Sequence, residues 1–274
     1  SSSSSSSSSS STAVDRFLIW DTLASSSPIA VPPDAKGWCI GGGAWTRRCV
    51  PPQFQSMGPE WWLAHLVSFA WRPNDRLERL IRGAERELQM DGVALVVGAH
   101  IRRGHKYIEI PPAPPEHLNA PLLAILSSAL SISTPPSATP PNASTLTHLI
   151  TRRIAAAPSS RRQWASILVA SEDNAAIRQV EGLAESVGAR VAVVDRDHPR
   201  PNLRVSIPMA CRLGLLDSHR ENLVSLISLF LLVRHSDALV ASFSSGYSRL
   251  IMELSLVSRS YRMPHHSLDV PFHV

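Results

Sequence analysis

The sequence has few of the features that mark membrane proteins, metal cages or disulfide-rich secreted domains. Its longest apolar stretch in the C-terminal half, Leu226 to Val233, is far shorter than the about 20 residues that a transmembrane helix needs. Its 3 cysteines are too few for a zinc cage, and their spacing fits no zinc pattern. We therefore expect no membrane span and no metal site.

Two pairs of residues could still suggest a disulfide or a metal site. Cys39 and Cys49 could form a disulfide in an oxidising compartment, or could be two buried thiols. His265 and His266 do not predict a metal site, because adjacent side chains of an extended segment point apart. The chain begins at Ser1 and not at methionine, so we expect a fragment or an incomplete gene model.

The composition is that of a folded protein with a modest basic excess. Hydrophobic residues make up 44% and charged residues 18% of the 274 residues, which argues against a disordered chain. The net charge of +5 would suit anionic partners such as phosphates, nucleotides or nucleic acid. Because no nucleic-acid-binding motif or interleaved aromatic and basic patch accompanies the excess, we do not expect nucleic acid as the partner.

The pattern along the chain predicts three regions. Residues 1–12, nearly all serine, cannot bury apolar surface and are expected to be disordered. Residues 13–91 form an irregular and helical part, in which apolar residues recur at helical spacing from Trp61 to Met90 with an interruption at Pro73. Residues 92–274 alternate strands and helices around a Pro/Ser-rich insertion at about 111–145.

That alternation predicts an α/β fold with a Rossmann-type, doubly wound and mostly parallel sheet. The first strand is the apolar run that starts at Val93 and ends at Ile101. Further strands are expected at 166–170, 190–194 and 238–242, and helices at 146–157, 174–187, 220–234 and from Tyr247.

The strands end in polar residues that should meet at one edge of the sheet. At the end of the first strand, His100 and Arg102 should point to one side and Arg103 to the other. An arginine in this place offers a fork of donors that matches phosphate oxygens, although paired arginines can also be a solvated surface or an ion pair. Lys106 and Glu109 follow, and an acid beside a lysine can take the proton of an alcohol acceptor or can belong to a charged loop.

Two other strand ends have comparable chemistry. Glu172 and Asp173 could accept hydrogen bonds from a sugar or a base, or could only favour the dipole of the helix that follows. Phe243, Ser244 and Ser245 stand where a strand turns into a helix, which is either an anion site or a plain helix cap. A shared edge favours the binding interpretation for all three strand ends.

Three motifs in this order resemble those of the α-1,6-fucosyltransferases, the family of the N-glycan core fucosyltransferases and the rhizobial chitin-oligosaccharide fucosyltransferases. Residues 100–106, HIRRGHK, resemble the family's HVRR-x-D-K motif. Residues 167–173 resemble a strand that ends in Thr-Asp-Asp, and residues 237–245 resemble D-x-L-V-x-T-F-S-S, followed here by Arg249 and Glu253. The likeness runs discontinuously from about 59 to 270, with residues 13–91 as a remnant of the acceptor-side domain.

The resemblance implies a GT-B-like architecture and an inverting, metal-independent transfer of fucose from GDP-fucose to a glycan acceptor, either an N-glycan or a chitin-like oligosaccharide. It implies a Golgi or secretory localisation and no cofactor. Arg102 would neutralise the β-phosphate, and Lys106 and Glu109 would activate the acceptor. The donor would be held by the residues of the three strand ends: His100, Arg103, Glu172, Asp173, Phe243, Ser244 and Ser245.

The sequence departs from the family at two positions with a bearing on function. His105 stands where the family has the aspartate of its first motif, and Leu229 stands where it has an aspartate eight residues before Asp237. Together with the short N-terminal part, these departures support an alternative hypothesis: a degenerate GDP-sugar-binding domain without transferase activity.

Overall fold

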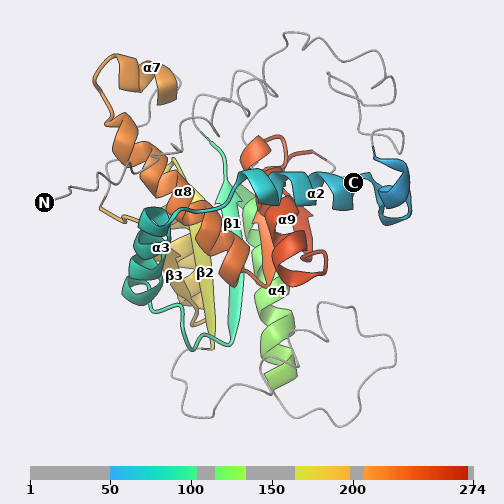
Figure 1. Cartoon of the computed structure of the whole chain (residues 1–274). Coiled ribbons are helices and arrows are strands. Elements are labelled where there is room, and N and C mark those ends of the chain that lie inside the picture. The colour runs from blue at the N-terminus through green and yellow to red at the C-terminus, as the bar shows by residue number, and fades with distance from the viewer. Residues whose placement is uncertain (1–49, 104–114, 134–163, 198–206, 271–274) are drawn as a thin grey trace, which may run out of the picture. The chain divides into compact units, whose positions relative to one another are not determined.

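The computed structural model describes residues 50–103, 115–133, 164–197 and 207–270 (Figure 1). The chain divides into two compact units, the first ending at Trp71 and the second beginning at Arg72. No helix within the described ranges is long and apolar enough to cross a membrane.

The described part of the first unit is a short helical segment. A 3-10 helix, η2 (Pro52–Met57), leads into α2 (Gly58–Ala70), with Gly58 at the junction in a left-handed conformation (φ 84°). The ring of Phe54 stacks on that of Trp62 with a centroid distance of 5.0 Å. Aromatic stacking therefore fixes η2 on the first turns of α2.

The second unit is built on five parallel strands. They are β1 (Leu95–Ile101), β2 (Ala165–Ser171), β3 (Arg190–Val193), β4 (Ala238–Ala241) and β5 (His265–Ser267), in the spatial order β3-β2-β1-β4-β5. This is the order of a Rossmann-like, doubly wound sheet. The predicted α/β fold with a parallel sheet is confirmed.

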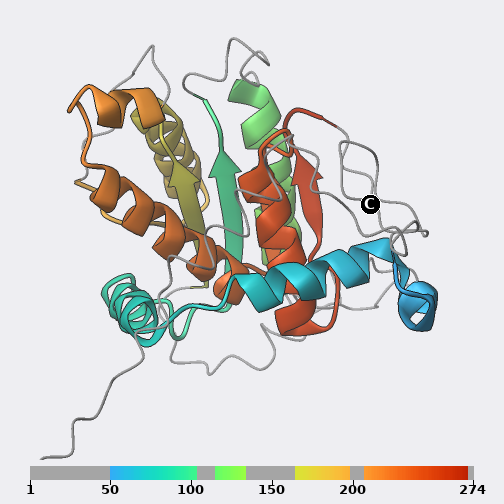
Figure 2. The same ribbon diagram turned by 45° about the horizontal axis from the view of Figure 1, so that its top comes forward.

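Helices cover both faces of the sheet, as Figure 2 shows. On one face lie α4 (Pro115–Ser133) and α6 (Asn174–Ser186). On the other lie α8 (Ser218–His235) and α9 (Gly246–Arg259), with α3 (Asp75–Glu87) against α8 and a short α7 (Ile207–Arg212) preceding α8.

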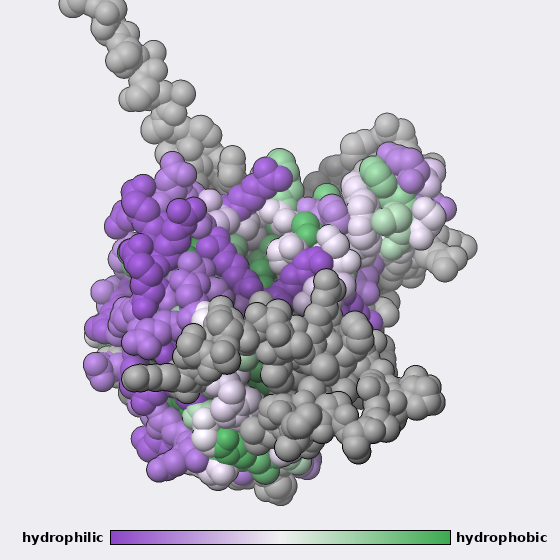
Figure 3. Space-filling model, turned by 90° about the horizontal axis from the view of Figure 1, so that it is seen from below, coloured by the Kyte–Doolittle hydropathy of each residue, from purple (hydrophilic) through white to green (hydrophobic). Residues whose placement is uncertain are grey.

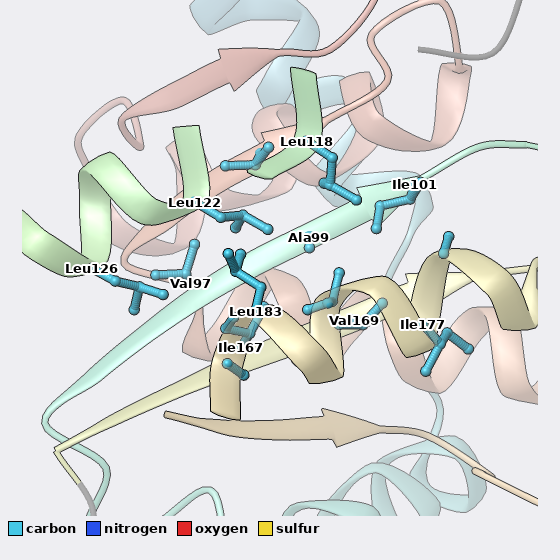
Figure 4. Packing of buried hydrophobic residues seen from close by; sticks show 14 of the residues in the cluster. Val97, Ala99, Ile101, Leu118, Leu122, Leu126, Ile167, Val169, Ile177 and Leu183 are labelled. Atoms are coloured by element: carbon cyan, nitrogen blue, oxygen red, sulfur yellow. The ribbon is translucent and has the colours of Figure 1, made fainter. Parts of the chain in front are cut away.

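The face under α4 and α6 carries an extended cluster of buried apolar residues. Leu118, Leu122 and Leu126, one turn apart along α4, are at most 1% exposed and point toward the odd-numbered residues of β1 (Figure 4). Ile167 and Val169 of β2 continue the same layer. Alternation along the strands thus places every second residue in this core.

The helix α4 differs from the expectation of a Pro/Ser-rich insertion at 111–145. Part of that segment is a helix whose leucines fill the core, because apolar residues at 118, 122 and 126 form one helical face despite Pro121 within the helix. Among the described residues, α4 is the helix that connects β1 to β2. The helix expected at 146–157 lies outside the described residues.

The boundary between the units also differs from the expected one at 91/92. Helix α3 belongs with the sheet, since Ile81 is fully buried and Arg234 of α8 donates to Glu78 of α3 at 2.6 Å. His235 and Glu85 approach to 3.0 Å beside this pair. The outer side of α3 is charged, in keeping with the hydrophilic surface on the left of Figure 3.

Candidate functional site at the carboxyl edge of the sheet

The strand order reverses between β1 and β4. The chain leaves β1 toward β2 on one side and leaves β4 toward β5 on the other. In doubly wound sheets, ligands bind outside the carboxyl ends of the strands at such a reversal. Arg102 follows β1 and Ser242 to Ser245 follow β4, so two of the predicted strand ends flank this point.

Arg102 and the start of α9 converge there. The backbone N–H of Arg102 donates to Ser242 Oγ at 3.3 Å, and its Nη1 donates to Ser245 Oγ at 3.1 Å. Ser245 is the N-cap of α9, where its hydroxyl also accepts from the N–H of Tyr247 at 3.3 Å. A guanidinium therefore lies beside the positive end of a helix dipole, and both favour an anion.

His100 lies on the same side of β1 and is held as a neutral ring. Burial, and then the nearby charge of Arg102, lower the pKa of His100 to about 3. Its Nδ1 is 2.6 Å from Ser248 Oγ, and the hydroxyl of Ser248 donates to the carbonyl of Ser242 at 2.7 Å. Because that hydroxyl has one proton, we assign the His100 proton to Nδ1, which leaves Nε2 as an acceptor.

Tyr247 closes the side of His100 that faces α9. The two ring centroids are 4.7 Å apart, and the Tyr247 hydroxyl donates to the carbonyl of Ser225 at 2.7 Å. Burial raises the pKa of Tyr247, so it remains a neutral phenol. The aromatic pair is thus fixed from both α8 and α9.

Arg103 points to the opposite side of the sheet, as strand alternation predicts. Its Nη2 donates to Gln179 Oε1 at 3.0 Å, and Gln179 Nε2 donates to Asn119 Oδ1 at 2.8 Å. Its Nη1 is 4.0 Å from the carboxylate of Asp173. Arg103 therefore links the end of β1 to α6 and α4, while Arg102 lies beside α9.

Glu172 and Asp173 are adjacent in sequence but differ in their surroundings. Asp173 caps α6 by accepting from the N–H of Ala175 at 2.8 Å. Glu172 Oε1 is buried and has no hydrogen-bond partner among the described residues. Burial raises the pKa of Glu172, and the charge of Arg102 opposes this shift. Of the two acids, Glu172 is the one near Arg102 with an oxygen to offer a ligand.

Phe243 and Ser244 take different places in the turn before α9. The ring of Phe243 is fully buried, with its centroid 5.2 Å from that of His265, so only its backbone is at the site. Ser244 donates from its hydroxyl to Asp269 Oδ2 at 2.5 Å and from its N–H to Asp269 Oδ1 at 3.2 Å. The sequence alone does not single out Asp269, although it follows β5 and a position directly after a strand is the signal that the other site residues share.

The remaining predicted positions divide into two groups. Lys106, Glu109 and His105 lie outside the described residues, as do Cys39 and Cys49. Leu229 is 1% exposed within α8, among the apolar residues of that helix. In the ranges that the structure describes, no three His, Cys, Asp or Glu side chains come together as metal ligands would.

The comparisons with known proteins add no family to this geometry. No protein-family model matches the chain, and no curated protein matches it.

Proposed function

We propose that the protein is an inverting glycosyltransferase of GT-B-like architecture that transfers fucose from GDP-fucose to a glycan acceptor. The observation that carries the proposal is the convergence of Arg102 with Ser245, the N-cap of α9, at the reversal of the strand order. The likeness of the three strand-end motifs to the α-1,6-fucosyltransferases supports the choice of donor.

Arg102 and α9 would act on the leaving group. As the bond from fucose to the β-phosphate breaks, negative charge accumulates on the phosphate oxygens. Arg102 carries a permanent positive charge and a fork of donors, and the N-terminus of α9 beside it adds the positive end of a helix dipole. This stabilisation is the role that a divalent cation has in other glycosyltransferases.

The neighbouring groups would hold the rest of the donor. Neutral His100 offers Nε2 as an acceptor for an N–H of the guanine base. Glu172 offers Oε1 as an acceptor for a hydroxyl of ribose or fucose. Glu172 would thereby gain the hydrogen bond that its burial otherwise denies it.

Acceptor activation rests on the resemblance. Glu109, assisted by Lys106, would take the proton of the acceptor hydroxyl while its oxygen attacks the anomeric carbon, and GDP would leave from the opposite face with its electron pair. The acceptor is an N-glycan or a chitin-like oligosaccharide, and the corresponding localisation is the Golgi or another secretory compartment.

A second candidate function is supported by Leu229. Where the fucosyltransferases have an aspartate, this chain places a leucine in an apolar core. A GDP-sugar-binding domain that has lost transfer would tolerate this exchange. Binding and transfer must therefore be measured separately.

The test is calorimetric titration of GDP into the wild-type protein and two arginine variants. Arg102→Ala should weaken binding by about tenfold to a hundredfold, because a charge-assisted hydrogen bond contributes about 1.5–3 kcal/mol. Arg82→Ala is the matched control: it removes the same charge from α3, where the side chain is 66% exposed, and should leave binding unchanged. Equal losses in both variants would contradict a phosphate site at Arg102.

A second test uses Glu172→Gln, for which thermal stability and donor affinity should change in opposite directions. Because burial raises the pKa of Glu172, its ionisation opposes folding increasingly as the pH rises through the folded-state pKa. The variant should therefore unfold at a higher temperature than wild type at pH 7, with a smaller difference at pH 4, while its affinity for GDP-fucose falls.

The outcomes separate the two functions. Absence of GDP binding to folded wild-type protein would refute both. GDP binding with neither fucose transfer to N-glycan or chitin-oligosaccharide acceptors nor hydrolysis of GDP-fucose would select the degenerate domain.

A further inference from the structure

We propose that Asp269 is a positioning residue that holds the turn between β4 and α9 in the shape that the phosphate site requires. This inference rests on the proposed function. Asp269 would touch no substrate, since it acts through Ser244 and the turn that contains Ser245.

The carboxylate of Asp269 is surrounded by donors from two segments. Ser244 binds both of its oxygens, from the hydroxyl at 2.5 Å and from the N–H at 3.2 Å. On its own segment, the N–H of Val270 donates to Oδ1 at 2.8 Å, while the single hydroxyl proton of Ser267 goes to the carbonyl of Val270. The arrangement joins the end of β5 to the end of β4 by charge-assisted hydrogen bonds.

The residue before Asp269 is fixed in the sheet. The N–H of Leu268 donates to the carbonyl of Ala241 at 2.9 Å, which extends the pairing of β4 and β5 to the residue before Asp269. Leu268 is 6% exposed and belongs to the apolar cluster under α4 and α6. The position of the carboxylate is therefore set by the core and not by a loop.

The turn held in this way carries the groups that meet Arg102. Ser242 accepts from the backbone N–H of Arg102, and Ser245 accepts from its Nη1. The N–H of Ser245 donates to the carbonyl of Ser242 at 3.1 Å, so Ser244 stands at the tip of a tight turn between these two contacts. If Ser244 is released, Ser245 is no longer held at hydrogen-bond distance from both Arg102 and the N–H of Tyr247.

Geometry and charge make opposite contributions at this position, which allows them to be separated. The hydrogen bonds of Asp269 order the turn, whereas its negative charge disfavours a phosphate nearby. Asparagine keeps an acceptor oxygen for the N–H of Ser244 and removes the charge, and alanine removes both. A positioning role therefore predicts that Asp269→Asn binds GDP at least as tightly as wild type does. Asp269→Ala should bind GDP less tightly than wild type.

The experiment is titration of GDP and GMP into wild type, Asp269→Ala and Asp269→Asn. Asp269→Ala should weaken GDP binding about tenfold, the effect of losing one charge-assisted hydrogen bond, and should weaken GMP binding less because GMP lacks the β-phosphate. Asp269→Asn should restore the affinity. Wild-type affinity in the alanine variant, or an asparagine variant as weak as the alanine variant, would overturn the proposal.

Asp217→Ala is the matched control for a loss of stability alone. Asp217 caps α8 by accepting from the N–H of His219 at 2.9 Å, also by a carboxylate before a helix. Its removal should lower the melting temperature as Asp269→Ala does, yet leave GDP and GMP affinity unchanged. A fall in GDP affinity in this control equal to that in Asp269→Ala would count against positioning.

Amide hydrogen exchange of the ligand-free proteins keeps this proposal distinct from the proposed function. Exchange at residues 244–246 should accelerate in Asp269→Ala and not in Asp217→Ala or Asp269→Asn. If wild type binds no GDP but this pattern appears, the proposed function fails and the structural part of the inference stands. Unchanged exchange in Asp269→Ala would refute the inference whatever GDP does.

Discussion

The sheet face under α4 and α6 is packed with apolar side chains, whereas the face under α8 and α9 also buries polar ones. The first face contains the leucines of α4, the odd-numbered residues of β1, and Ala165, Ile167 and Val169 of β2. On the second face, serines of α8 and α9 and the segments beside them are at most 6% exposed: Ser228, Ser236, Ser245, Ser248 and Ser255. The candidate site is an extension of that second face.

Small side chains also bring the backbone closer on the polar face. A Cβ on Gly98 of β1 would lie 2.4 Å from Ser236 Oγ and 2.9 Å from Leu232 Cδ2. Nearby, the N–H of Val96 donates to Asp237 Oδ2 at 2.9 Å and so ties β1 to the start of β4. The comparison teaches that one face provides bulk stability while the other sets the spacing of β1, β4 and α9, on which the site depends.

The largest expected effect tests the apolar face. Leu122→Ala should destabilise the protein by about 2–5 kcal/mol, because it leaves a cavity beneath α4. Urea unfolding measures the loss, and GDP affinity of the folded fraction should be unchanged. Leu123→Ala, at a partly buried neighbour, should cost less. Equal and small losses at both positions would mean that α4 does not pack on the sheet.

A smaller effect is expected from overpacking the polar face. Gly98→Ala should cost about 1–3 kcal/mol, since its methyl group would overlap Ser236 and Leu232. Gly182→Ala is the matched control in α6, where a Cβ would meet nothing within 4 Å, and should stabilise the protein by about 0.5–1 kcal/mol. Thermal unfolding measures the change in stability of both variants. Equal stability changes in the two variants would mean that β1 and α8 lie too far apart for the added methyl group to overlap Ser236 and Leu232.

The last effect, which accumulates only with pH, concerns the charge state of the polar face. Burial lowers the pKa of His100 to about 3 in the folded state. At pH values between the ordinary pKa of histidine and about 3, the ring is therefore protonated in the unfolded state and neutral in the folded state. Stability should thus decline as the pH falls through this window, with His100 contributing at most about 1.4 kcal/mol per pH unit. The difference between wild type and His100→Gln in urea unfolding at several pH values isolates this slope. Parallel profiles would show that His100 can be protonated in the fold.

The strands were predictable because their sequences carry a local signal. The continuous apolar run before Arg102 is typical of a strand buried on both faces, and alternation correctly placed Arg102 and Arg103 on opposite sides. The helix α4 was missed because its prolines and serines resemble a surface insertion. Its leucines become informative only when the core that they fill is known.

The candidate site was predictable as a set of strand ends but not as a set of contacts. The sequence placed Glu172 and Asp173 together, yet only the fold shows that Asp173 caps α6 while Glu172 lies near Arg102. Asp269 could not be connected to Ser244 from sequence, because the pairing of β4 with β5 decides which two turns meet.

The strand order also has a consequence for how the chain folds. Arg102 and Ser245 are separated by 143 positions along the chain, and β1 pairs on one side with β2 and on the other with β4. During synthesis, β1 emerges long before the strand that completes its second edge, so an apolar strand must wait with that edge uncovered. Such non-local pairing slows folding and exposes intermediates to aggregation. Because β1 is the central strand, the arrangement that aligns Arg102 with α9 also requires that β4 pair with β1 slowly and late in folding.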